Sequence, residues 1–144
     1  FDFYYSPSGS GNASMANLSM KDDIEITKCF VSTIDSFVTS TGLKIDFLKC
    51  DVEGAELFVF QGGLNAINKY RPVIFSEILR KWSAKFNYNP NQIIELLSGV
   101  GYNCYTVSGN KLKEFFRMDE NTIETNFFFL HKDKHEKKIQ EYVR

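Results

Sequence analysis

Residues 45–60, IDFLKCDVEGAELFVF, hold the sharpest change of pattern in the chain. A short apolar run leads into Lys49 and Asp51, and Glu53 and Gly54 then precede a second apolar run. The first run suits a strand that is covered on both faces, as the strands of parallel sheets are. The second run carries apolar residues three and four positions apart, which indicates a helix with one buried side. The stretch therefore predicts a strand, a tight turn that holds two carboxylates, and a helix.

The rest of the chain continues this alternation. Strands are predicted over residues 1–5, 24–30, 45–50, 73–78, 102–107, 111–116 and 126–130, and helices over residues 32–42, 54–71 and 89–99. Such alternation implies an α/β fold with a mostly parallel sheet and helices on its faces. The small, polar residues 6–14 predict a mobile loop, across which the first two strands pair as an N-terminal β-hairpin.

Local signals set some of the helix boundaries. Ser32 and Asp35 have the spacing of a capping box at the start of the first helix. Gly62-Gly63 weakens the second helix in its middle. Residues 131–144 are highly charged and predict a solvated, helical tail.

The composition of the 144 residues indicates one domain. We divide it into a hairpin insertion (1–31), an α/β part (32–130) and the charged tail (131–144). A net charge of −1 leaves no basic footprint for nucleic acid, and no apolar run approaches the roughly 18 residues of a membrane span. Three scattered cysteines fit a reducing compartment, so we expect a cytoplasmic protein.

Three acids are the main candidates for a functional site. In open α/β sheets, ligands bind outside the carboxyl ends of the strands, and Asp51, Glu53 and Glu77 all fall at such ends. Glu53 and Asp51 could instead be a helix cap and a turn former, and Glu77 could pair with Lys49, Arg71 or Arg80. Three like charges at one edge favour a ligand or a cation that compensates them. Mg²⁺ is one candidate, with Asp51, Glu53 and Glu77 as its ligands.

Other motifs carry weaker signals. SGSG (8–11) has no helix after it, and GVG (99–101) follows a helix, so neither predicts a phosphate site. His131 and His135 have the spacing of metal ligands, but no third ligand accompanies them. Three aromatic residues either line a pocket or pack on the sheet edge: Trp82, Phe86 and Tyr88.

The segments IDFLKCDVEGAELFVFQGG (45–63) and RPVIFSEI (71–78) resemble the FkbM-type methyltransferase family. TID (33–35) and GYNCYTV (101–107) are similar to two further segments of that family. The matching positions are Lys49, Asp51, Glu53, Gly54, Glu56, Gly62, Pro72 and Glu77. The resemblance implies a Rossmann-like class I methyltransferase fold that uses S-adenosylmethionine.

For such an enzyme, the positions of individual residues at the strand ends suggest their roles. Asp51, Glu53 and Glu77 would serve catalysis, and Lys49, Asp51 and Gly54 would contact the cofactor. The family's D-x-G-x-x-x-G loop and its ribose-binding acid do not occur in these 144 residues. We therefore expect the C-terminal part of the methyltransferase domain, whose cofactor-binding N-terminal half lies outside this chain and without which it is inactive.

The expected function is O-methylation of a small hydroxylated substrate, either a sugar or a natural product. The alternative is a non-catalytic α/β interaction domain, or a natural remnant that cannot bind the cofactor alone, which self-associates as a homo-oligomer through its apolar sheet edge. A phosphoryl-transfer enzyme with a carboxylate-bound cation fits less well, because no phosphate-cradling loop is present.

Overall fold

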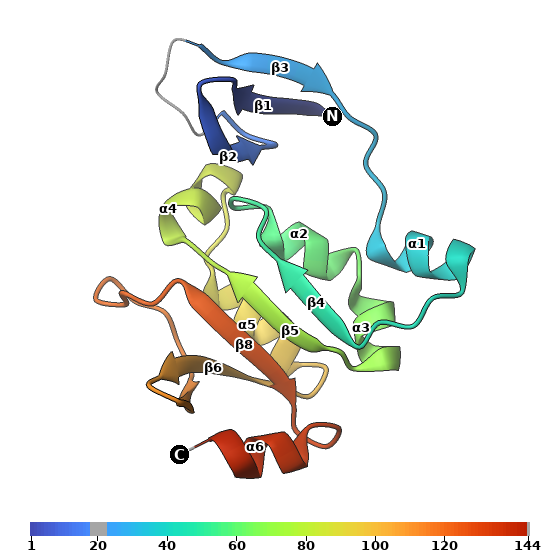
Figure 1. The fold of residues 1–144 in the computed structure, drawn as a ribbon, viewed down its shortest axis with the longest axis vertical. Helices are drawn as coiled ribbons and strands as arrows, with labels where there is room; N and C mark the ends of the chain where they lie inside the picture. Colours follow the sequence, from blue (N-terminus) through green and yellow to red (C-terminus); the bar gives the residue numbers. More distant parts are fainter. Residues whose placement is uncertain (18–22, 144) are drawn as a thin grey trace.

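The computed structural model describes residues 1–17 and 23–143 and contains two sheets (Figure 1). The small sheet has the strand order β2-β1-β3, and the large sheet has the order β4-β5-β8-β6-β7. The strands are β1 (Asp2–Ser6), β2 (Gly9–Ser14), β3 (Glu25–Lys28), β4 (Phe47–Cys50), β5 (Val73–Glu77), β6 (Tyr102–Ser108), β7 (Lys111–Phe115) and β8 (Asn126–His131). The helices are α1 (Ile34–Thr41), α2 (Glu56–Gln61), α3 (Leu64–Tyr70), α4 (Arg80–Ser83), α5 (Asn91–Ser98) and α6 (Glu136–Tyr142), with a 3-10 turn, η1 (Ala84–Phe86).

The large sheet is mixed, so the prediction of a mostly parallel sheet is wrong. Its described strands form one parallel pair, β4 with β5, and three antiparallel pairs. β8 returns between β5 and β6 and runs antiparallel to both, and β7 folds back on β6 as a hairpin. β5 and β6 still point the same way, because each is antiparallel to β8. The predicted alternation thus gave the direction of β4, β5 and β6 correctly.

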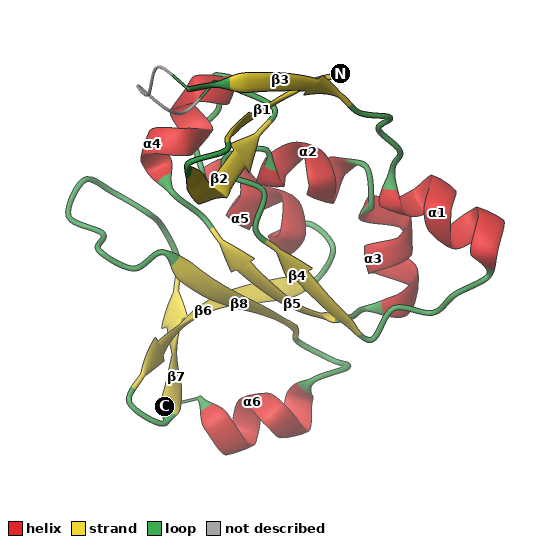
Figure 2. Cartoon of the chain, turned by 45° about the horizontal axis from the view of Figure 1, so that its top comes forward, coloured by secondary structure: helices red, strands yellow, loops and turns green. Residues whose placement is uncertain are grey.

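Helices lie on both faces of the large sheet, as predicted (Figure 2). α2, α3 and α5 cover one face, and α6 lies on the other. The predicted buried side of the helix after Gly54 supplies much of the core. Its residues Phe60 and Ile67 are fully buried together with Ile74 of β5 and Phe129 of β8. Burying such side chains stabilises the fold by about 1.5–3 kcal/mol each.

The small N-terminal sheet confirms the pairing of the first two predicted strands. β1 and β3 are antiparallel, with Tyr4 opposite Ile26. The loop prediction for residues 6–14 is wrong, because residues 9–14 form β2 on the other edge of β1. Small polar residues are compatible with a strand at the edge of a sheet. Part of the predicted hairpin insertion, residues 18–22, lies outside the described residues.

The start of α1 is capped by a different residue from the one predicted. Thr33, and not Ser32, caps α1 by accepting a hydrogen bond from the backbone N–H of Ser36 at 3.1 Å. The Asp35 carboxylate instead accepts from the backbone N–H of Ala66 at 2.8 Å, in the first turn of α3. Asp35 therefore joins two segments far apart in the sequence.

The predicted helix 54–71 is two helices, α2 and α3, which are separated at Gly62-Gly63.

The C-terminal segment is helical as predicted, but its beginning is not solvated. His131 and His135 are 3% and 6% exposed. The Nδ1 atom of His135 accepts a hydrogen bond from the backbone N–H of His131 at 2.9 Å, which closes the turn between β8 and α6. Residue 144 lies outside the described residues. Among residues 1–17 and 23–143, no helix combines the length and apolar character needed to span a bilayer.

Candidate functional site

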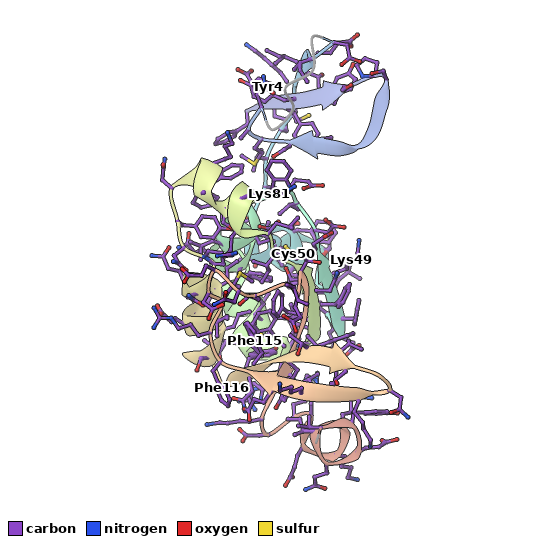
Figure 3. The ribbon with its side chains drawn as sticks, turned by 90° about the vertical axis from the view of Figure 1, so that its left-hand side faces the viewer. Tyr4, Lys49, Cys50, Lys81, Phe115 and Phe116 are labelled. Carbon is purple, nitrogen blue, oxygen red and sulfur yellow. The ribbon has the colours of Figure 1, made fainter. Side chains whose placement is uncertain are left out.

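The predicted acids lie at one edge of the large sheet. In the parallel pair of β4 and β5, Cys50 is opposite Ser76, so Asp51 and Glu77 follow at the same end. Figure 3 shows Lys49 and Cys50 of β4 below Lys81 of α4, with the small N-terminal sheet above them. The carboxyl ends of β4 and β5 thus face the space beneath that sheet.

The turn between β4 and α2 has an unusual backbone. Glu53 has a φ of 52° and Gly54 a φ of 103°, so two successive residues have positive φ. A Cβ atom on Gly54 would lie 2.8 Å from the carbonyl carbon of Trp82 and 2.9 Å from Cε2 of Phe86. Only glycine fits this position, because the backbone of α4 and an aromatic ring pack directly against its Cα. Gly54 is therefore explained by protein packing, and its contact with a cofactor stays a prediction.

Glu56 holds this turn in place, although we did not predict it as a site residue. It is 2% exposed, and its Oε1 accepts from the backbone N–H groups of Gly54 at 2.9 Å and Val52 at 3.3 Å. Its Oε2 accepts from the hydroxyl of Tyr88 at 3.2 Å. Buried carboxylates need such partners. Its spacing from Phe60, four residues along the buried stripe, is the sequence signal for its burial.

The turn is also fastened to the N-terminal sheet. Ser14, at the end of β2, is 1% exposed, and its hydroxyl donates to the carbonyl oxygen of Glu53 at 3.2 Å. We call residues 51–56 the acid turn. Its backbone is thus fixed by Glu56 from within, by Trp82 and Phe86 at one side, and by Ser14.

The acids of the turn have different electrostatic environments. Asp51 is paired with Lys49 across 2.8 Å at the surface, a contact that contributes little to stability because both groups are hydrated. Glu53 is half-buried, and burial raises the pKa of its carboxyl, helped by the negative charges of Asp51 and Glu77. A raised pKa makes Glu53 a better proton acceptor than an ordinary surface glutamate.

The purely structural roles considered for Glu53 and Glu77, a helix cap and an ion pair, are not observed. No described ion pair joins Glu77 to Lys49, Arg71 or Arg80. Glu53 does not cap α2. The N-cap position of α2 is Ala55, which makes no side-chain capping hydrogen bond. Across the described ranges, no three His, Cys, Asp or Glu side chains gather closely enough to hold a metal ion. The structure therefore gives the magnesium hypothesis no support.

The predicted aromatic residues that follow β5 contribute both to packing and to a pocket. Phe86 packs on Gly54 and also lines a cleft beside α2. Tyr88 bonds to Glu56, and Phe58 of α2 contacts both aromatic rings edge-on at centroid distances of 6.0 Å.

These features define an α/β protein whose acids gather at the carboxyl ends of two parallel strands, next to a cleft. The family model for the FkbM methyltransferase domain matches residues 2–104. The chain therefore belongs to the FkbM methyltransferase domain family. Comparisons with curated proteins and with solved structures gave no match.

Proposed function

We propose that this domain transfers a methyl group from S-adenosylmethionine to a hydroxyl oxygen, on a sugar or on a natural product. The observation that carries the proposal is the acid turn, where Glu53 combines partial burial with a raised carboxyl pKa at the carboxyl end of β4. Membership of the methyltransferase family supports the same reaction class.

The charge at this edge fits the cofactor. S-Adenosylmethionine carries positive charge on its sulfonium and ammonium groups, and Asp51, Glu53 and Glu77 bring three carboxylates to one edge of the sheet. Opposite charges within a few ångströms favour the ionised form of each partner. When bound, the cofactor supplies an activated methyl group, and Asp51 and Lys49 would lie beside its methionine portion.

The contribution of the chain is alignment and proton transfer. Glu53 accepts the proton of the acceptor hydroxyl, because its raised pKa lies closer to that of a useful general base. The fixed backbone of the acid turn holds that carboxylate in position, which lowers the entropic cost of reaction. Burial is the main cause of the raised pKa of Glu53, and the negative charges of Asp51 and of Glu77 at the end of β5 add to it.

The test is Glu53→Gln in the full-length protein, with Glu124→Gln on an exposed loop as a matched control. General-base catalysis contributes about 100-fold or more, so the first variant should lose at least that factor in methyl transfer. Wild-type turnover in Glu53→Gln would remove Glu53 from the mechanism. Calorimetric titration with S-adenosylhomocysteine is an independent readout, and absence of binding by the wild type would favour the non-catalytic interaction domain.

A further inference from the structure

A cleft of about 610 Å³ lies between the small N-terminal sheet and the starts of α1 and α2. We call it the aromatic cleft, and its main lining residues are Phe1, Met15, Val31, Ile34, Phe58 and Phe86. Three of them are large apolar side chains with high exposure: 75% for Phe1, 56% for Val31 and 47% for Phe58. Small-molecule sites typically have volumes of about 300–1,000 Å³ and mostly apolar walls. Apolar side chains that gather in such a hollow indicate a binding site.

The aromatic cleft adjoins the acid turn through three separate contacts. Ala55 of the acid turn lines the cleft. Phe86 forms part of the cleft wall and packs against Gly54. Met15 also lines the cleft and follows Ser14, whose hydroxyl is bonded to the carbonyl oxygen of Glu53. A molecule in the cleft would therefore lie beside the backbone of the acid turn, although the side chains of Asp51, Glu53 and Glu77 do not line the cleft.

The walls of the cleft favour one class of molecule. Phe58 presents a partly exposed ring that contacts Phe86 edge-on, an arrangement that accepts a further ring. The hydroxyl of Thr33 is already engaged in capping α1, which leaves few free polar side chains to bond sugar hydroxyls. A sugar transferred to such walls would lose hydrogen bonds with water without replacing them.

We propose that the aromatic cleft binds the body of the methyl acceptor, and that this body is an apolar, ring-bearing structure with a hydroxyl group. The inference rests on the proposed methyl transfer and decides between the two acceptor classes named there, against sugars. The N-terminal sheet then acts as the wall that completes the acceptor site, because Phe1 directly precedes β1 and Met15 directly follows β2.

The experiment measures binding without turnover, by calorimetric titration of the full chain with 2-naphthol and, separately, with glucose. We expect saturable binding of 2-naphthol and none of glucose at the same concentrations. Phe58→Asp and Val31→Asp should each weaken 2-naphthol binding at least about tenfold, since a charge in an apolar pocket costs several kcal/mol. Phe116→Asp is the matched control, because Phe116 is 76% exposed and lies far along the molecule from the N-terminal sheet (Figure 3).

Several results would overturn the inference: glucose binding as tight as that of 2-naphthol, or 2-naphthol binding that survives both cleft substitutions in variants shown to be folded by circular dichroism. Competition between adenosine and 2-naphthol would assign the cleft to the cofactor and would also overturn it. If 2-naphthol binds as expected and the full-length protein shows no methyl transfer, the proposed reaction fails while the ligand class of the cleft is supported.

Discussion

Replacing Gly54 by alanine tests the packing of the acid turn with a single methyl group. The Cβ atom of alanine would lie 2.8 Å from the carbonyl carbon and oxygen of Trp82 and 2.9 Å from Cε2 of Phe86. Non-bonded carbon atoms are normally about 3.5–4.0 Å apart. The carbonyl of Trp82 belongs to the backbone of α4 and cannot rotate away, so either the turn or α4 must move.

The expected loss follows from two contributions. A non-glycine residue with a φ of 103° costs about 1–2 kcal/mol, and overpacking by one methyl group costs about 1–3 kcal/mol more. The free energy of unfolding should therefore fall by about 2–5 kcal/mol. With an unfolding entropy of about 2.1 cal/mol/K per residue over 144 residues, that loss lowers the Tm by about 7–17 °C.

Gly109→Ala is the matched control for the backbone contribution. Gly109 has a φ of 63°, and a Cβ atom there would meet nothing within 4 Å. This variant should lose only about 1–2 kcal/mol, or about 3–7 °C in Tm. Both variants are measured by differential scanning calorimetry and by urea unfolding. Equal losses in the two variants would refute the packing of Trp82 and Phe86 against Gly54.

The other predictions concern buried and titrating groups. Glu56→Ala should lower the free energy of unfolding by about 2–5 kcal/mol, because two backbone N–H groups lose their acceptor. Glu56→Gln should lose less, since its amide can accept from the backbone and donate to Tyr88. Urea unfolding compares the stabilities of the two variants. Burial lowers the pKa values of His131 and His135 below 6.5. As the pH falls below 6.5, the unfolded chain takes up protons that the folded chain does not, so thermal melts should show falling stability, and His131→Asn/His135→Asn should flatten this dependence. The pKa of Glu53 is raised above 4.5, so the methyl-transfer rate should rise with pH through a pKa above that value, and a rate independent of pH from 4.5 upward would contradict the role of Glu53 as base.

The elements that the sequence predicts best carry their information locally. The apolar run before Asp51, the glycine after Glu53 and the helical spacing that follows lie within 16 residues, and the structure has β4, the acid turn and α2 there. The two consecutive glycines Gly62 and Gly63 likewise indicated the weak point at which α2 ends. Such signals depend on backbone preferences and on burial of one helix face, both of which short segments determine.

Long-range contacts determine what could not be predicted. Nothing in residues 126–131 shows that β8 inserts between β5 and β6, because an apolar strand suits parallel and antiparallel pairing alike. The capping of α3 by Asp35 joins positions that are 31 residues apart. The burial of His131 was missed because the residues that follow it in the sequence are charged, whereas its ring packs edge-on against Tyr102 of β6 at 5.3 Å.

Glu53 occupies a backbone position that favours glycine, as do Arg71 and Asn87 among the described residues. A non-glycine residue with a φ of 52° is uncommon and strained, and the surrounding contacts of Ser14, Gly54 and Glu56 hold its backbone there. A turn that served folding alone would be as stable with glycine. Glu53→Gly should therefore leave the free energy of unfolding unchanged or raise it by up to about 1 kcal/mol, while methyl transfer falls by about 100-fold or more. Urea unfolding and a methyl-transfer assay on the same preparation measure both quantities. A loss of stability above about 1 kcal/mol would instead show that the Glu53 side chain is needed for the fold, and full activity would show that it is not needed for the reaction.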